Sequence, residues 1–179
     1  IPAQNLSVIV YWAPILTKLA KAPHKELPDI LFSAQMIPEE RLKGTLKNVS
    51  TVVRNGGRAI DEVIQGLSDL TLEEQEEVLK LARPLFGEEA SNGDRNAIIC
   101  GLLAVPQDRR ENVAKIVSMA TFHDATGQGA VNAINKIIAN PDIYARFLDA
   151  YTRLKEACHR HSAADASAEA GEAAAAAGH

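Results

Sequence analysis

The feature that most constrains this chain is a helix-start signal that returns at nearly constant spacing. A proline or threonine followed by polar or acidic residues occurs five times, at Pro2, Pro38, Thr71, Pro106 and Pro141. Proline suits the first helical position because its missing amide hydrogen would have no partner there, and acidic residues favour the positive end of the helix dipole. By residue number the intervals are 36, 33, 35 and 35 residues, so the sequence predicts tandem helical repeats.

Apolar residues inside these segments fall about seven, ten, eleven and fourteen residues after the start, which is one face of an α-helix. In the second segment the apolar residues slip by about one position, and in the fifth the pattern begins well and then becomes polar. The matching residues are Ile9, Trp12, Ala13 and Leu16, then Leu46, Val49 and Val53, then Val78, Leu81, Ala82 and Leu85, then Val113, Ile116, Val117 and Ala120, and finally Leu148 and Tyr151.

A second helix is predicted after each of the first four, most clearly over 58–67, 95–104 and 130–139. These segments align in three apolar columns: Val63, Ile98 and Ala133; Ile64, Ile99 and Ile134; Leu67, Leu102 and Ile137. In the first repeat the second helix is expected to start near Leu27 and end at Gln35. Glycine- and asparagine-rich breaks, at 54–57, 91–94 and 126–129, separate the two helices, because these residues tolerate the left-handed conformation that ends a helix.

The expected fold is therefore all-α: a short α-solenoid of about four antiparallel helix pairs plus a C-terminal capping helix. The repeats lie near 1–36, 37–70, 71–105 and 106–140, with a closing helix over 141–155. Aromatic residues make up only 4% of the chain, which suits closely packed helices better than a sheet. Residues 156–179 are rich in alanine and have no large apolar face, so we expect a mobile tail.

Charge and cysteine content exclude several classes of protein. The net charge of −4 gives no general attraction for nucleic acid or anionic membranes, and no apolar run is long enough for a membrane span. The start at Ile1, without a basic leader, predicts no signal peptide and suggests a processed chain or a fragment. Two cysteines cannot build a disulfide framework, so we expect a cytoplasmic chain in which Cys100, within an apolar run, is a buried free thiol.

Candidate chemistry is sparse. Cys158, His159 and His161 carry zinc-ligand atoms, but no second Cys/His pair lies nearby in sequence to complete four ligands. Cys100 and His123 could form a nucleophile–base pair only if the fold joined them, and no third orienting residue is evident. We therefore predict no catalytic residue, no metal, no cofactor and no enzymatic activity, with a hydrolase or metal site around Cys158 as the third-ranked hypothesis.

The leading hypothesis is an interaction module that binds a protein or peptide through its second helices and breaks. Polar and basic residues near the breaks are the candidate contacts: Arg54, Asn55, Arg58, Asn92, Arg95 and Gln128. The partner's identity and the oligomeric state do not follow from the sequence.

Two family resemblances extend these hypotheses. The segments 37–41 (IPEER) and 105–113 (VPQDRRENV) resemble degenerate helical repeats in effector-like proteins of bacteria that live inside eukaryotic cells. That resemblance covers most of 1–154 and implies a platform for interactions, acting after delivery into a host cell. The segments 52–60 (VVRNGGRAI) and 127–134 (GQGAVNAI) look similar to transcription-activator-like effector repeats, which implies nucleic-acid binding through Arg54, Arg58 and Arg95. The variable breaks and the acidic net charge disfavour this alternative.

Overall fold

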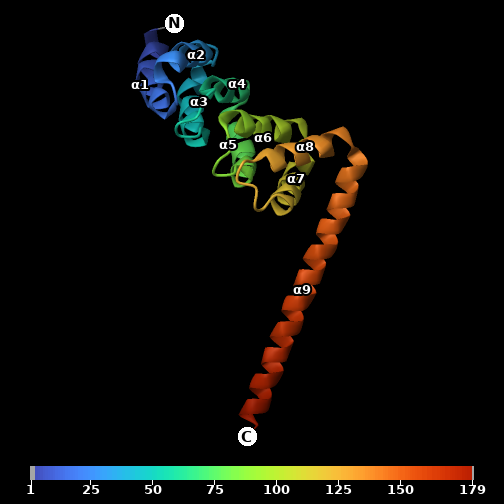
Figure 1. Ribbon diagram of the computed structural model, residues 1–179. Coiled ribbons are helices and arrows are strands. Elements are labelled where there is room, and N and C mark those ends of the chain that lie inside the picture. The colour runs from blue at the N-terminus through green and yellow to red at the C-terminus, as the bar shows by residue number, and fades with distance from the viewer. Residues whose placement is uncertain (1–2, 179) are drawn as a thin grey trace. The chain divides into compact units, whose positions relative to one another are not determined.

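The computed structural model describes residues 3–178, and every regular element within them is a helix. The chain divides into two compact units, an N-terminal unit up to Ala139 and a C-terminal unit from Asn140. The C-terminal unit contains α9 (Pro141–Ala177). The N-terminal unit (Figure 1) contains α1 (Ala3–Leu19), α2 (Pro23–Gln35), α3 (Glu39–Val52), α4 (Ile60–Ser68), α5 (Leu72–Ala82), the 3-10 turn η1 (Arg83–Leu85), α6 (Asn92–Ala104), α7 (Gln107–Ala120) and α8 (Gln128–Ala139).

The helices begin where residues suited to the first turn or the N-cap stand, and not where the apolar pattern begins. α2 begins at Pro23, not near Leu27, because Pro23 occupies the first turn, where a proline loses no hydrogen bond. α6 begins at Asn92, three residues before the predicted start, since the Ser91 hydroxyl accepts a hydrogen bond from the Asp94 amide. α5 has a reciprocal capping box between Thr71 and Glu74.

The predicted apolar columns form the core of the N-terminal unit. Ile64, Ile99 and Ile134 are fully buried, and the columns on either side are buried except for Ala133, which is partly exposed. In the first helices, Trp12 and Leu81 are also only partly buried, and Ala120 is exposed. Burial of a large aliphatic side chain contributes about 1.5–3 kcal/mol, so these columns stabilise this unit together with the other buried side chains.

The slip predicted in the second repeat disappears once buried polar residues are counted. Thr45 stands seven residues after Pro38 and is completely buried, and Val52 fills the position fourteen residues on. Gln75 donates from Nε2 to the Thr45 hydroxyl at 2.9 Å and to the Leu67 carbonyl at 3.0 Å. These bonds satisfy the amide inside the core. With Thr45 and Val52 counted, the buried positions after Pro38 follow the spacing predicted for the other segments.

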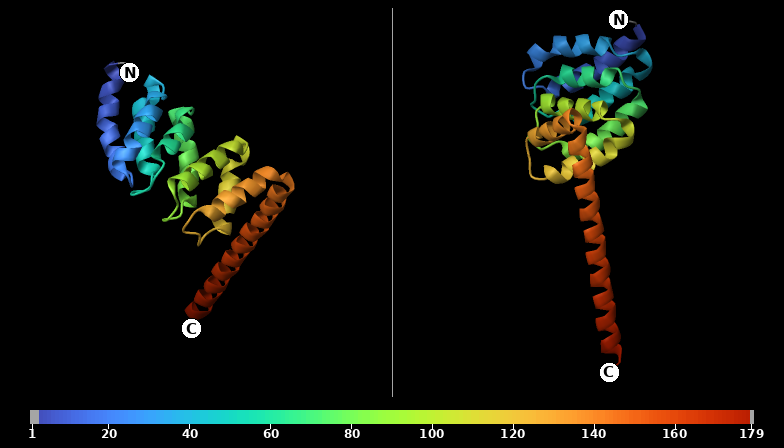
Figure 2. Two further views of the ribbon diagram at one scale, coloured as in Figure 1. Left: turned by 45° about the horizontal axis from the view of Figure 1, so that its top comes forward. Right: turned by 90° about the vertical axis from the view of Figure 1, so that its right-hand side faces the viewer.

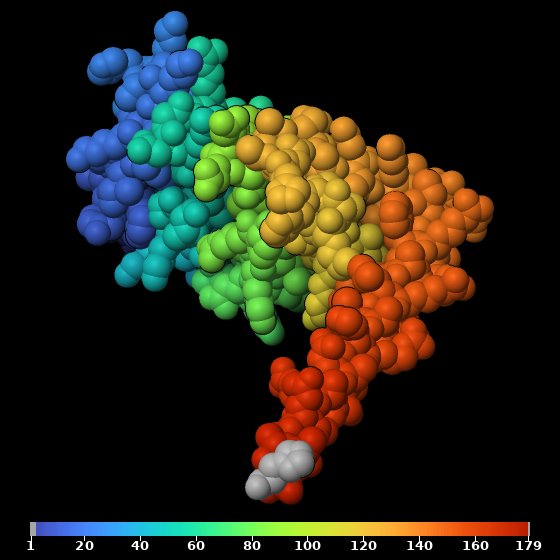
Figure 3. All heavy atoms as spheres, turned by 60° about the horizontal axis from the view of Figure 1, so that its bottom comes forward, coloured from blue at the N-terminus to red at the C-terminus, as the bar shows by residue number. Residues whose placement is uncertain are grey.

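Helix contacts in the N-terminal unit follow a regular order. Each first helix (α1, α3, α5, α7) packs against its own second helix (α2, α4, α6, α8), and each of these rows also packs along itself from one repeat to the next. Figure 2 shows the pairs following one another in chain order, and the colours follow the same order on the face seen in Figure 3. Each of the helices α1 to α8 therefore contacts its partner in the pair and its neighbours in its own row.

The C-terminal unit contains one continuous helix, which spans both the predicted closing helix and most of the alanine-rich segment. α9 is a single helix of 37 residues that continues through the alanine-rich segment to Ala177. Its start is capped by the Asn140 side chain, which accepts from the Asp142 amide at 3.1 Å. Alanine has the highest intrinsic helix propensity, and no proline interrupts the segment after Pro141. None of the residues of α9 is buried.

Candidate interaction surface

Four breaks, 20–22, 53–59, 86–91 and 121–127, separate the two helices of each pair and are here called the first to fourth breaks. The third break lies before the predicted 91–94, most of which belongs to α6. Successive breaks are hydrogen-bonded to one another. The Lys21 amide donates to the Gly57 carbonyl at 2.7 Å, and the Gly56 amide donates to the Leu19 carbonyl at 2.7 Å. Gly56 has a φ of 74°, a left-handed conformation that suits glycine. The first and second breaks thus meet through backbone pairing, including a short parallel bridge between Ala20 and Gly57.

Asn92 and Arg95, both on α6, form hydrogen bonds that join this helix to the chain around the second break. The buried Asn92 side chain accepts from the Arg54 amide at 2.6 Å and donates to the Arg58 carbonyl at 2.8 Å. Arg95 donates from Nη1 to the Val52 carbonyl at 2.7 Å and from Nε to the Ala90 carbonyl at 3.1 Å. Both side chains satisfy backbone groups that the breaks would otherwise leave without partners.

The third and fourth breaks meet in the same way. The Glu89 amide donates to the Ala125 carbonyl at 2.9 Å. Gly87 approaches that carbonyl so closely that a Cβ at this position would collide with it, which explains the need for glycine. Asp124 holds the fourth break by accepting from the Thr126 hydroxyl and from the Gly129 amide, and these hydrogen bonds lower the pKa of its carboxyl group.

The structure brings four of the six predicted contact residues together, and these six residues differ in how exposed they are. The four residues that meet at the second and third breaks are Arg54, Arg58, Asn92 and Arg95. Gln128 lies elsewhere, at the start of α8, where its Nε2 donates to Oδ1 of Asn132 at 3.5 Å. Asn92 is 1% exposed and has no free surface for a partner. The exposed side chains among the six are Arg54, Asn55, Arg58 and Gln128.

The arginines differ in how much of each guanidinium group is free. Arg95 lies over the Phe86 ring at 5.4 Å, and burial, followed by the nearby charge of Arg54, lowers its pKa. Arg54 donates from Nη1 to the Glu89 carbonyl at 3.1 Å. Arg58 is exposed, and no described residue forms a hydrogen bond or ion pair with its side chain. Only Arg58 therefore presents an uncommitted cation here.

The second-helix surface, formed by the outward side chains of α4, α6 and α8, has few charges. The exposed residues of these three helices are Glu62, Gln65, Cys100, Ala104, Gln128, Asn132, Asn135, Lys136, Ile138 and Ala139. After Arg95, α6 contains no charged residue, and α8 contains only Lys136. This surface combines small side chains with amides that can both donate and accept hydrogen bonds.

Cys100 belongs to this surface, so the prediction of a buried thiol was wrong. Its neighbours Ile99 and Leu102 face the core, and a helix turns Cys100 away from them by about 100° per residue. An unbroken apolar run cannot all point inward. The Cys100 thiol contacts the Asn96 side-chain oxygen at 3.7 Å, and partial desolvation raises its pKa, which keeps it protonated at neutral pH.

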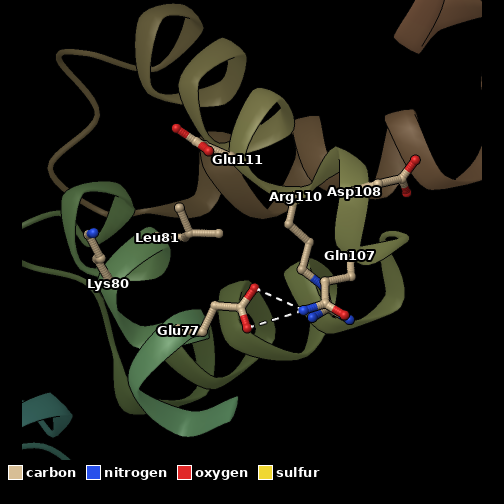
Figure 4. Close-up of a pocket in the computed structure, with 7 residues that line it drawn as sticks. All are labelled: Glu77, Lys80, Leu81, Gln107, Asp108, Arg110 and Glu111. Carbon is tan, nitrogen blue, oxygen red and sulfur yellow. Dashed lines mark hydrogen bonds between the residues drawn. The ribbon is translucent and has the colours of Figure 1, made fainter. Parts of the chain in front are cut away.

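The first-helix side is heavily charged by comparison. α5 and α7 each contain five charged residues, and a groove of about 760 Å³ lies between them (Figure 4). Gln107 bridges the groove by donating to both carboxylate oxygens of Glu77 at 3.4 Å. Arg110 is committed to the chain, because it donates to the carbonyls of Val105 and Leu103 at 2.9 and 3.1 Å. The groove therefore mixes both signs of charge.

The residues named in the catalytic and metal hypotheses have the following surroundings within residues 3–178. No group of three or more His, Cys, Asp or Glu side chains there is placed to hold a metal ion. On α9, His161 lies 3.5 Å from Asp165, and Cys158 is an exposed free thiol. The Cys100 thiol is directed to Asn96.

Comparison with family models, with curated proteins and with solved structures gave no match to this chain. Within the described part of the chain, none of the helices combines the length and apolar character that a membrane-spanning segment needs.

Proposed function

We propose that the N-terminal unit is a segment of α-solenoid that binds a protein or peptide through its second-helix surface, without catalysis. Two rows of helix contacts running in chain order support the solenoid arrangement, as does the pairing of successive breaks. In such an array each repeat contacts its neighbours, and the outward faces of one row form a continuous surface.

The observation that carries the proposal is the low charge of the second-helix surface. Charged residues are depleted at the centres of protein interfaces, where desolvation would cost more than it returns. From Asn96 to Ala104, α6 has no charged side chain, whereas α5 has five. Arg54, Asn55, Arg58 and Gln128 border this surface at the breaks and supply polar contacts at its rim.

A protein or peptide partner is favoured over nucleic acid by the state of the arginines. Neutralising phosphates requires free cations, and Arg54 and Arg95 already donate to backbone carbonyls. The chain also carries a net charge of −4. The resemblance to effector-like repeats makes a host protein one class of partner, and the two exposed free thiols suit a reducing cytoplasm.

The test is a selection of binding peptides from a random displayed library against the intact chain. The selected peptides are then measured against Cys100→Arg, which places a bulky cation on the second-helix surface. The matched control is Lys80→Glu in the groove between α5 and α7. We expect Cys100→Arg to weaken binding by about tenfold or more, as at an interface centre, and Lys80→Glu to leave it within about twofold.

Two results would contradict the proposal. Peptides that tolerate Cys100→Arg but lose affinity with Lys80→Glu would move the binding surface to the first helices. Absence of selected peptides, together with DNA or RNA binding that weakens steeply with added salt, would favour the nucleic-acid alternative.

A further inference from the structure

The junction between the second and third breaks is filled by two arginine side chains of the chain itself. Arg95 donates from Nη1 to the Val52 carbonyl at 2.7 Å and from Nε to the Ala90 carbonyl at 3.1 Å. Arg54 donates from Nη1 to the Glu89 carbonyl at 3.1 Å. Guanidinium groups, which carry several donors in one plane, therefore satisfy the backbone carbonyls of this junction.

At the junction between the third and fourth breaks, small residues take both arginine positions. Gly87 stands sixteen residues after its helix-start signal, as Arg54 does. Ala130 stands eleven residues before the next signal, as Arg95 does. Neither has a side chain that reaches across the junction, and an open pocket of about 390 Å³ lies there, lined by residues 84–88, 118 and 121–125. We call it the break pocket. Its lining includes the residues that correspond by position to Val52 and Ala90, namely Leu85 and Ala125.

The charges of the break pocket suit a cation. The carboxylates of Glu88 and Asp124 line it, and no lysine or arginine of the described residues does. The exposed Glu88 side chain has no hydrogen-bond or ion-pair partner among the described residues. Asp124 is ionised at neutral pH, because hydrogen bonds from Thr126 and Gly129 lower the pKa of its carboxyl group. A cation in the pocket therefore meets two negative charges.

The aromatic rings of the break pocket favour a guanidinium over other cations. Phe86, Phe122 and His123 line the pocket, and the rings of Phe122 and His123 meet edge to face at 4.6 Å. A phenyl face attracts cations, and a planar, weakly hydrated guanidinium stacks on it better than an ammonium does. The chain already makes this contact once, because the Arg95 guanidinium lies over the Phe86 ring at 5.4 Å.

Phe122 is 78% exposed, and neither its place in the array nor a loose loop accounts for this. The residues sixteen positions after the first and second helix-start signals, Lys18 and Arg54, are also exposed although further repeats follow them, and the third repeat has a glycine there. The fourth break is held by Asp124, which accepts from the Thr126 hydroxyl at 2.7 Å. An ordered segment therefore presents Phe122 to a ligand from outside.

We propose that the break pocket binds the guanidinium group of an arginine side chain on a partner peptide. Glu88 accepts two parallel hydrogen bonds from the guanidinium, Phe122 stacks on its plane, and Asp124 contributes negative charge. The proposal rests on the proposed function only in taking the partner to be a protein or peptide. The pocket itself is distinct from the second-helix surface.

Nuclear magnetic resonance titration of the intact chain with a blocked arginine, N-acetyl-arginine N-methylamide, tests the proposal. We expect a dissociation constant of about 1 mM, with amide shifts at 86–88 and 121–125. The matching citrulline probe, in which a neutral urea replaces the guanidinium, should bind about tenfold more weakly or worse. The matching lysine probe should bind about threefold more weakly or worse, because an ammonium neither stacks in a plane nor forms two parallel hydrogen bonds.

Two pairs of matched variants locate the contact. Glu88→Gln should raise the dissociation constant of the blocked arginine by about fivefold or more, whereas Glu89→Gln, the adjacent exposed carboxylate outside the lining, should leave it within about twofold. Phe122→Leu keeps an apolar side chain but removes the ring, and should raise the constant by about threefold. Phe32→Leu, at an exposed ring on α2, should leave it unchanged. All four side chains are exposed, so these variants should fold.

The absence of shifts with the blocked arginine up to about 20 mM overturns the proposal. Equal affinity for the citrulline or lysine probe overturns it too, as does equal weakening by Glu88→Gln and Glu89→Gln. Peptide selection against the second-helix surface is a separate readout. Failure of the blocked arginine to bind, with selected peptides still bound, rejects the break pocket alone, and the reverse outcome rejects only the proposed function.

Discussion

α4 and α9 are the shortest and the longest α-helices in the described residues, and they owe their helical state to different causes. α4 has 9 residues, and Ile60, Val63, Ile64 and Leu67 are all completely buried. α9 has 37 residues and buries none of them. An isolated helix shorter than about 12–15 residues is marginal in water, so α4 depends on tertiary packing. α9 depends mainly on the intrinsic propensity of alanine. Length therefore does not indicate which helix is the more stable.

The largest expected effect comes from truncating the core column. Ile64→Ala should destabilise the N-terminal unit by about 2–5 kcal/mol, because it removes buried methyl groups and leaves a cavity. Leu154→Ala, at a half-exposed position on α9, should change the free energy of unfolding by less than about 0.5 kcal/mol. Urea unfolding followed by circular dichroism measures both. Similar effects for the two variants would remove the distinction between the helices.

A second prediction compares the same glycine-to-alanine substitution in the two units, where we expect opposite effects on helix stability. A Cβ at Gly101 would lie 2.8 Å from Cγ2 of Ile134, so Gly101→Ala should destabilise the N-terminal unit by about 1–3 kcal/mol. Gly171 has no atom within 4 Å of an added Cβ, so Gly171→Ala should only increase the helicity of α9. Thermal unfolding and backbone chemical shifts give the two readouts, and destabilisation by Gly171→Ala would refute the prediction.

The hydrogen bonds between breaks are the next target. Asn92→Ala removes the partner of the Arg54 amide and of the Arg58 carbonyl, which should cost about 1–3 kcal/mol. Asn55→Ala, at an exposed position in the second break, serves as the control and should be nearly neutral. Chemical denaturation supplies the comparison. An equal cost for both asparagines would show that Asn92 does not join the repeats.

The smallest effect is expected at a helix cap. Thr71→Ala deletes the hydroxyl that accepts from the Glu74 amide and should destabilise the N-terminal unit by about 0.5–2 kcal/mol. Thr152→Ala, within α9, removes a hydroxyl that only bonds to the preceding turn and should have no such cost. Differential scanning calorimetry distinguishes them, and an unchanged unfolding temperature in Thr71→Ala would contradict the role of the cap.

Periodicity predicted the core because Ile64, Ile99 and Ile134 recur at a fixed interval with the same chemistry. It did not identify Thr45 and Gln75 as core residues, since a polar residue in a core column is recognisable only when its partner across repeats is known. It also placed Cys100 inside, because an apolar run is longer than the face that a helix buries. The role of Asn92 depends on partners more than thirty residues away in sequence, which local patterns do not contain.

Hydrogen exchange of the intact chain, followed by mass spectrometry, tests most directly whether stacking of the repeats, and not local helix propensity, stabilises the N-terminal unit. We predict that amides in α4 and α6 exchange slowly, through opening of the whole unit, while those over 156–177 exchange far faster despite lying in the longest helix. Equal protection of the two regions, or faster exchange in α4 than in the alanine-rich part of α9, would contradict this account.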